Sequence, residues 1–299
     1  MTTVRIAVPR KGRPLEAVLE RLATRTDSTN LADDVISTLR YEKAIAKGDQ
    51  TAGPSVYDRL AEYSDPTDPT APEFSLLRDD RESMPRRIVF DSVTIPTESV
   101  DLRLIGREEP FRALRKHEFA LGFDSADLVL EEVVRLESDP LADITALNER
   151  IDPRDTDVRV STGLGDTVYH TLLATPAVAR SLPGDLDRSA VEAYEGELCL
   201  SPRYERLVEA VLGTRATAGV EFRHPDRERT EEAAIAETGL GVYLTVSGST
   251  AREHGLVVGK QLFPSETVLL ENVAESRPAV EDVIDLVEGS VAETALAVQ

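Results

Sequence analysis

The chain has 299 residues, of which 41% are hydrophobic and 30% are charged, a composition typical of a globular protein. Its length allows one large domain or two smaller domains with sizeable cores. No apolar run approaches the roughly eighteen residues that a membrane span needs, so a membrane protein is excluded. The formal charge is −21 and only five of the 34 basic residues are lysines. Nonspecific nucleic-acid binding, which needs clustered basic charge, is therefore excluded, and any local basic cluster becomes notable.

Two further features indicate the compartment. The chain runs from Met1 almost directly into an apolar strand, so no signal peptide is expected. The single cysteine, Cys199, excludes an internal disulfide and a cysteine-based metal cluster. We expect a cytoplasmic protein, whose acidic, lysine-poor surface is similar to that of proteins from salt-loving archaea.

Hydrophobic patterning predicts alternating strands and helices along the chain. Short apolar runs predict strands at residues 4–8, 88–90, 100–105, 119–123, 167–174, 197–200, 218–222, 242–246, 256–262 and 267–273. Helical spacing predicts helices at residues 15–22, 33–46, 55–63, 109–117, 127–136, 187–194, 203–212 and 228–236, and a last one after Ser276. This alternation predicts the α/β class with largely parallel sheets.

The number of elements exceeds what one small sheet needs, so we expect two lobes with a cleft between them. The first lobe would contain residues 1–123 and 255–299, with an insertion at about 24–87. The second would contain residues 124–254. Whether the insertion covers a cleft or is a passive surface decoration stays open.

A turn within residues 246–256 (VSGSTAREHGL) is the strongest candidate binding element. The strand at residues 242–246 enters a tight turn, and a short helical turn closed by Gly255 follows. Glycine lets the backbone approach a ligand closely, and hydroxyls beside the unpaired N–H groups of a helix start suit a phosphate. An ordinary strand–turn–helix with a Ser/Thr cap is the alternative.

A second candidate follows the first strand, where residues 9–14 read PRKGRP. Three cations in four residues around a glycine suit a multiply charged anion such as pyrophosphate. The alternative is a solvated loop at the sheet edge. The four histidines are scattered without metal-ligand spacing, so we predict no metal site, and catalytic residues stay unassigned.

Four segments, in chain order, resemble the ATP phosphoribosyltransferase family, whose members catalyse the first step of histidine biosynthesis. RIAVPRKGRP at residues 5–14 is similar to the family's opening strand and NKGRL, and FALGFDSAD at 119–127 to its ADLGITGxD. SPRYERL at 201–207 resembles A-[ST]-K-Y-P-N-L, and SGSTAREHGL at 247–256 resembles TGxTLxxNGL. The resemblance, to a divergent, short-form-like member, spans most of the chain.

The resemblance implies a two-lobed fold like that of type II periplasmic binding proteins, with the active site in the cleft. Family members join N1 of the ATP adenine to C1 of phosphoribosyl pyrophosphate and release pyrophosphate, using Mg²⁺. By resemblance, the phosphate-binding residues are Ser247, Gly248, Ser249 and Thr250. The residues for pyrophosphate or nucleotide are Lys11, Arg13, Arg107 and Asp127. A homo-oligomer is also implied by resemblance alone.

The sequence departs from the family in the strand before the phosphate turn. Family members usually carry acids there that face the ribose hydroxyls and the metal. This chain has no Asp or Glu between Gly239 and Thr250, and Tyr243 and Val246 stand in that region. Two hypotheses stay open. The favoured one is a phosphoribosyltransferase acting on a nucleotide or another acceptor; the alternative is a noncatalytic ligand-binding or regulatory protein on the same fold.

Overall fold

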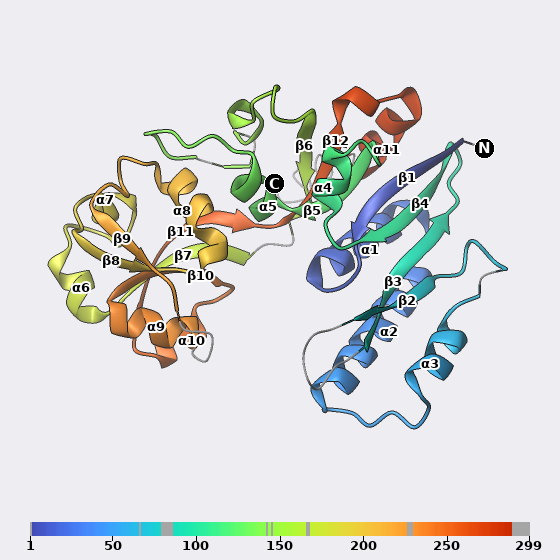
Figure 1. Cartoon of the computed structure of the whole chain (residues 1–299), viewed down its shortest axis with the longest axis horizontal. Helices are drawn as coiled ribbons and strands as arrows, with labels where there is room; N and C mark the ends of the chain where they lie inside the picture. The colour runs from blue at the N-terminus through green and yellow to red at the C-terminus, as the bar shows by residue number, and fades with distance from the viewer. Residues whose placement is uncertain are drawn as a thin grey trace, which may run out of the picture. The chain divides into compact units, whose positions relative to one another are not determined.

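A computed structural model describes residues 2–65, 67–78, 86–141, 143–144, 146–165, 168–225 and 230–288. The chain divides into two compact units (Figure 1). Unit 1 comprises Met1–Asp124, Asp157–Leu164 and Thr267–Gln299, and unit 2 comprises Ser125–Thr156 and Gly165–Glu266. Among the described helices, none has the length and apolar character needed to cross a membrane.

Unit 1 is built on a seven-stranded sheet in the order β2-β3-β4-β1-β5-β12-β6. Its strands are β1 (Thr2–Pro9), β2 (Glu73–Arg78), β3 (Arg86–Ile95), β4 (Val100–Arg107), β5 (Leu121–Ser125), β6 (Val158–Gly163) and β12 (Thr267–Asn272). The central strand β1 pairs in parallel with both β4 and β5. The carboxyl end of β1 therefore adjoins that of β4, with Pro9 opposite Arg107.

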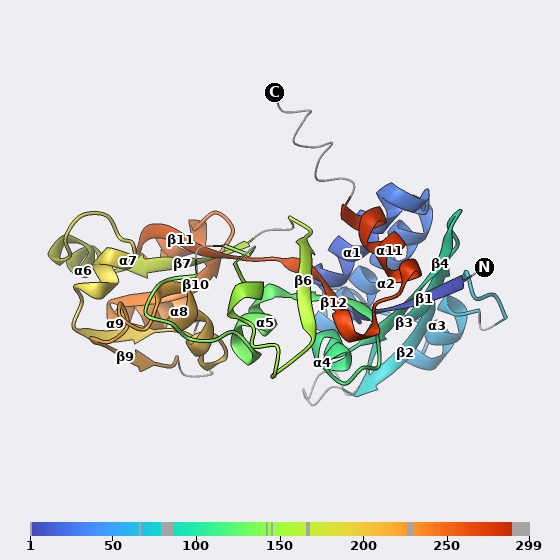
Figure 2. The ribbon, with the colours of Figure 1, turned by 90° about the horizontal axis from the view of Figure 1, so that it is seen from above.

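Helices cover both faces of the unit 1 sheet. They are α1 (Arg13–Thr26), α2 (Thr29–Lys47), α3 (Val56–Tyr63), α4 (Pro110–Arg115) and α11 (Pro278–Glu288). Buried residues of α1, α2 and α11 share one apolar cluster with strand residues such as Ile6 and Val8. Helix α4 lies on the other face (Figure 2). Its Leu114 packs so close to Gly122 that a Cβ at position 122 would lie 2.6 Å from Leu114 Cδ1.

Local sequence explains the limits of the first two helices. In α1, Leu15, Val18, Leu19 and Leu22 recur on one face and are buried, each contributing roughly 1.5–3 kcal/mol. Helix α2 ends at Gly48, whose φ of 81° lets its N–H return to carbonyls of the last turn. The residues predicted as an insertion thus form α2, α3 and β2, and α2 supplies core side chains of unit 1.

Unit 2 is built on a five-stranded sheet in the order β11-β7-β10-β8-β9. Its strands are β7 (Val168–Ala174), β8 (Gly196–Cys199), β9 (Val220–Arg223), β10 (Leu240–Thr245) and β11 (Val257–Ser265). Its helices are α5 (Ala126–Glu132), α6 (Pro176–Ser181), α7 (Arg188–Glu192), α8 (Glu205–Leu212), α9 (Glu231–Thr238) and α10 (Ser249–Glu253).

The α/β class and the two-unit organisation agree with the sequence-based expectation, but the expectation of largely parallel sheets is wrong. β7 pairs antiparallel with both β10 and β11, and β3 pairs antiparallel with β2 and β4. Only residues 96–99 separate β3 from β4, which is too short for a parallel crossover. Residues 257–265, expected in the first lobe, pair with β7 in the sheet of unit 2.

Smaller differences concern individual elements. β2, β6 and α6 were not predicted, and α5 ends at Glu132, before the expected residue 136. Residue 167 of the expected strand at 167–174 and residues 228–229 of the expected helix at 228–236 lie outside the described residues. The expected cleft between the two lobes stays a prediction.

Candidate functional site

The Ser247–Thr250 turn follows the carboxyl end of β10, as predicted. Gly248 has a φ of 70°, in the left-handed region, and forms the N-cap of α10. A Cβ at this position would lie 2.9 Å from Val258 Cγ2, so conformation and space both require glycine. Ser247 Oγ donates to Ser249 Oγ at 3.1 Å, and Arg252 Nη1 donates to the Ser247 carbonyl at 2.9 Å. Hydrogen bonds among residues 247–252 therefore stabilise the conformation of the turn.

The polar groups of this turn face outward. Ser247, Ser249 and Thr250 are exposed, whereas Gly248 is buried against β11. The N-cap Gly248 has no side chain to cap α10, and Ser247 Oγ instead accepts the N–H of Ser249 at 3.4 Å. The turn thus offers exposed hydroxyls at the start of a helix to solvent or to a ligand. Val246, one of the residues in the region where family members carry acids, is 78% exposed at the entrance to the turn.

Asp127, expected at the ligand, is buried within unit 2 and both of its carboxylate oxygens have partners. Ser265 Oγ donates to Oδ2 at 2.7 Å, and His170 Nε2 lies 3.2 Å from Oδ1. The carboxylate thereby links α5 to β7 and β11. His170 Nδ1 is buried and makes no hydrogen bond to the described residues.

Two of the segments that carry the family resemblance meet at this carboxylate. The Tyr204 ring, from the SPRYERL segment, packs edge-on against His170 with centroids 4.8 Å apart. Burial, followed by the nearby charge of Asp127, raises the pKa of the Tyr204 phenol. His170 and Ser265 were given no role at the site from the sequence, because they are distant from Asp127 in the chain.

Asp124 has a structural position that explains one departure from the family motif. Its carboxylate accepts the backbone N–H of Phe111 at 2.9 Å, at the start of α4. Ser125 caps α5 by accepting the N–H of Asp127. The Asp124–Ser125 pair, which replaces Thr-Gly of the family pattern, therefore caps two short helices.

In unit 1, the cations of the PRKGRP loop have different environments. Arg10 donates to Asp91 at 2.6 Å and to Ser75 at 3.0 Å, and so ties the loop to β2 and β3. Lys11 Nζ lies 3.5 Å from Glu108, a weak contact between half-exposed groups. Arg13 is exposed at the start of α1. The loop lies at the carboxyl edge of the central strands, where open α/β sheets bind ligands.

Arg107 belongs to the same sheet edge, but its guanidinium lies over the Phe119 ring, 5.0 Å from the centroid. The Arg5 guanidinium also lies 5.0 Å from this centroid. Phe119 thus engages two arginines in cation–π contacts. In this arrangement the Arg107 guanidinium is directed at Phe119.

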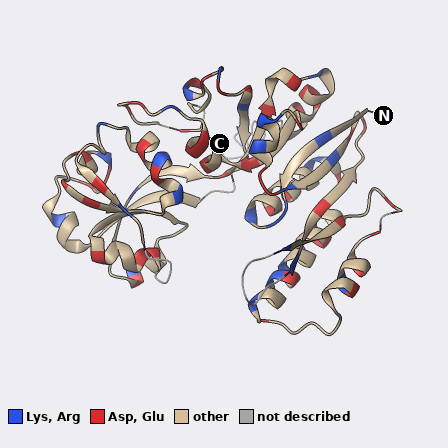
Figure 3. Ribbon diagram, in the orientation of Figure 1, with Lys and Arg blue, Asp and Glu red and all other residues tan. Residues whose placement is uncertain are grey.

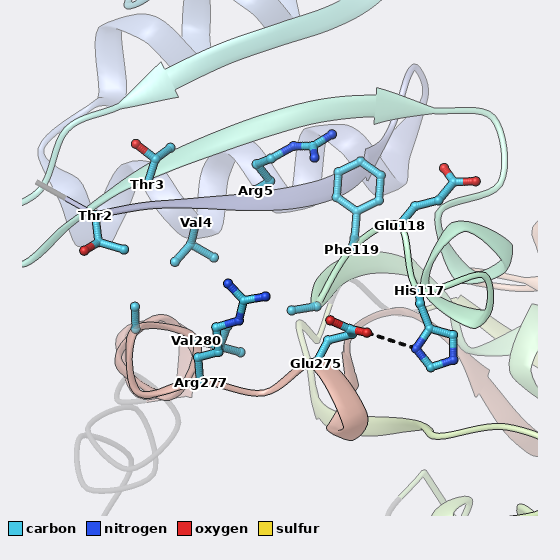
Figure 4. Close-up of a pocket in the computed structure, with 12 residues that line it drawn as sticks. Thr2, Thr3, Val4, Arg5, His117, Glu118, Phe119, Glu275, Arg277 and Val280 are labelled. Carbon is cyan, nitrogen blue, oxygen red and sulfur yellow. Dashed lines mark hydrogen bonds and ion pairs between the residues drawn. The ribbon is translucent and has the colours of Figure 1, made fainter.

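A separate pocket of about 280 Å³ opens beside the amino-terminal half of β1 (Figure 4). Figure 4 shows that side chains from three segments of unit 1 line it, among them Arg5, Phe119 and Arg277. On one side His117 Nδ1 lies 3.2 Å from Glu275. None of the residues predicted as a ligand site lines this pocket.

The described residues do not form a dedicated magnesium site. In this part of the chain, no group of three or more His, Cys, Asp or Glu side chains could hold a metal ion. Magnesium often needs fewer, since it binds through one or two carboxylates together with substrate phosphates. The strand and turn from Leu240 to Thr250 supply no such carboxylate.

This chain is similar to several solved structures at low sequence identity. The ATP phosphoribosyl transferase (HisG:HisZ) complex of Thermotoga maritima is 15% identical over 96% of both chains, with a TM-score of 0.42. YhfZ of Shigella flexneri is 11% identical over 97% of this chain and 84% of that one, with a TM-score of 0.40. The regulatory domain of a LysR family regulator, MetR of N. meningitidis, is 12% identical over 64% of this chain and 80% of that one, with a TM-score of 0.31.

The sequence comparisons decide the family. A search of curated proteins found no match. The family model described as halobacterial ATP phosphoribosyltransferase matches residues 1–298, nearly the whole chain. The chain therefore belongs to the halobacterial ATP phosphoribosyltransferase family.

Proposed function

We propose that this protein binds phosphoribosyl pyrophosphate, or a closely related phosphorylated ligand, and transfers its ribosyl group to a nucleotide or another acceptor. The family match over residues 1–298 carries the proposal. The geometry of the turn supports it, because exposed hydroxyls at the start of a helix follow the carboxyl end of β10. The 5′-phosphate is assigned to Ser247–Thr250, and the pyrophosphate or nucleotide to the PRKGRP loop.

The proposed chemistry needs no nucleophile from the protein. The bond between the anomeric C1 and the pyrophosphate oxygen breaks, and pyrophosphate leaves with the electron pair. A ring nitrogen of the acceptor forms the new bond to C1. The protein contributes by positioning the two ligands and by stabilising the charge on the leaving group. Lys11 and Arg13 are the residues we assign to that charge.

Magnesium enters this proposal only with the ligand. A bound Mg²⁺ would neutralise part of the pyrophosphate charge, and it would arrive coordinated by the ligand's own phosphates. Phosphate recognition by Ser249 and Thr250 requires no metal.

A specific observation favours a second candidate, a noncatalytic ligand-binding or regulatory protein. Where family members carry acids, this chain has Tyr243 and the exposed Val246. Each carboxylate absent from a ribose site removes charge-assisted hydrogen bonds worth roughly 1.5–3 kcal/mol. Phosphate recognition would survive this loss more readily than ribose recognition.

Calorimetric titration in molar KCl with Mg²⁺ tests the binding step, using phosphoribosyl pyrophosphate, ATP and ribose 5-phosphate in turn. Ser249→Asp places a negative charge in the turn and should weaken phosphoribosyl pyrophosphate binding by about tenfold or more, or 1.4 kcal/mol. Ser181→Asp adds the same charge at an exposed position at the end of α6 and should leave the affinity unchanged. If both variants bind phosphoribosyl pyrophosphate with equal affinity, the turn is not the binding site.

A second measurement separates the two candidate functions. Pyrophosphate release is followed after the protein is mixed with phosphoribosyl pyrophosphate and a panel of nucleotide acceptors. Acceptor-dependent release that Ser249→Asp abolishes supports the enzyme. Tight binding without release for any acceptor supports the noncatalytic protein.

A further inference from the structure

Unit 1 contains a second concentration of positive charge, in a hollow between the start of α1 and the second half of α2. The hollow has a volume of about 500 Å³, within the range of small-molecule sites. Figure 3 shows basic residues at the carboxyl-terminal end of α2. The charged residues that line the hollow are Arg13, Glu16, Arg40, Lys43, Lys47 and Asp49, an excess of two positive charges.

This excess is unusual for the chain. The protein has 55 acidic and 34 basic residues, yet two of its five lysines line this one hollow. Arg40, Lys43 and Lys47 lie three and four positions apart and therefore on one face of α2. Like charges at such spacing repel by about 0.2–0.5 kcal/mol per pair, so the stripe carries an electrostatic cost in the absence of a counter-ion.

The helix dipoles explain only part of the arrangement. Lys47 lies in the last turn of α2, where the negative end of the dipole stabilises a cation. Arg13 lies at the first position of α1, where the positive end of that dipole disfavours a cation. An anion in the hollow would relieve this repulsion and meet the cations of both helices.

The nearby carboxylates do not neutralise the lysines. Glu16, the acid in the first turn of α1, is 2.6 Å from Arg40 and pairs with it. Lys43 and Lys47 are exposed, and neither makes an ion pair with another described residue. The two ammonium groups are available to a ligand.

We propose that this hollow binds the distal phosphates of a small polyphosphate ligand whose nearer part contacts the PRKGRP loop. The inference rests on the proposed function for the loop, and Arg13 belongs to both features. From Arg40 to Lys47 the helix rises roughly 10 Å, a stripe suited to several linked phosphates rather than to one. A long nucleic acid is disfavoured as the ligand, because the chain's charge of −21 repels an extended polyanion.

A chain-length series tests the proposal on the full-length protein. Phosphate, pyrophosphate and tripolyphosphate are titrated by calorimetry into the wild type and the Lys43→Gln/Lys47→Gln variant, at a KCl concentration where circular dichroism shows both folded. Two lost charge-assisted contacts should lower tripolyphosphate affinity by about tenfold. Phosphate affinity should change by less than about twofold, since a single phosphate makes fewer contacts with the stripe than three linked phosphates do.

A matched control removes the same charge elsewhere. Lys116→Gln/Lys260→Gln also deletes two exposed lysines, one after α4 and one in β11, and should bind tripolyphosphate as the wild type does. Wild-type binding by the Lys43→Gln/Lys47→Gln variant, or an equal loss in the control, would overturn the proposal. The Ser249→Asp variant distinguishes a failure of the proposed function from a failure of this inference. It should weaken phosphoribosyl pyrophosphate binding and leave tripolyphosphate binding intact.

Discussion

Replacing Gly248 with alanine should destabilise the region of α10 and β11 by about 2–5 kcal/mol. The left-handed backbone, at a φ of 70°, costs an alanine about 1–2 kcal/mol. The new methyl group would also lie 2.9 Å from Val258 Cγ2, and such overpacking typically costs about 1–3 kcal/mol. Val258 is β-branched and stiff, so it cannot move its methyl away without leaving its rotamer.

Gly255 provides the matched control. It has a similar φ of 72°, but a Cβ there would meet no atom within 4 Å. Gly255→Ala should therefore show only the backbone cost of about 1–2 kcal/mol. Adding Val258→Ala to Gly248→Ala should recover part of the difference, because it removes the clashing methyl group.

The measurement is amide hydrogen exchange of peptides from β10 and β11, which reports the local free energy of opening. Global unfolding would be less informative, because a chain of two units need not unfold in one step. Phosphoribosyl pyrophosphate affinity should fall in Gly248→Ala and persist in Gly255→Ala. The reasoning fails if Gly248→Ala opens no more readily than Gly255→Ala, or if Val258→Ala rescues nothing.

Two further predictions concern buried polar groups. Ser265→Ala should lower the stability of unit 2 by about 1–3 kcal/mol, because the buried Asp127 carboxylate loses its hydrogen-bond donor at 2.7 Å. The control Ser181→Ala, at an exposed position, should lower it by less than about 0.5 kcal/mol. Hydrogen exchange measures both changes. Burial, and then a hydrogen bond to Glu42, raises the pKa of Tyr63 to about 12 from its ordinary value of 10. Since the neutral phenol is favoured in the folded state, this stabilisation should be fully present below pH 10 and lost as the pH rises towards 12. Between pH 10 and 12 the midpoint temperature of thermal unfolding should therefore fall less in the Tyr63→Phe variant than in the wild type. Identical dependence of this midpoint on pH in the two proteins would contradict the raised pKa of Tyr63.

Local rules were sufficient for much of the fold. Helical spacing of apolar residues predicted α1 and α11, and apolar runs predicted strands such as β1 and β10. These elements could be predicted because each depends on residues close in the chain. The glycine at position 248 could be predicted for the same reason, because a left-handed turn is a local requirement.

Strand direction and pairing depended on the tertiary structure. β7 looks the same in sequence whether its neighbours run parallel or antiparallel, so its pairing with β10 and β11 could not be predicted. β6 follows a long irregular segment and was not predicted. It pairs with β12 at the edge of the unit 1 sheet. Such pairings join residues separated by many positions, and single-sequence patterns carry no signal for them.

For the candidate site, sequence by itself determined which segments carry phosphate-binding chemistry and which family they resemble. Only the tertiary structure decided what each side chain does there. It buried Asp127 between His170 and Ser265, turned Arg107 towards Phe119, and brought α2 beside Arg13 to form a basic hollow. Motifs record residue types along the chain, whereas burial and contacts arise from packing between distant segments, so the tertiary structure alone assigns these environments.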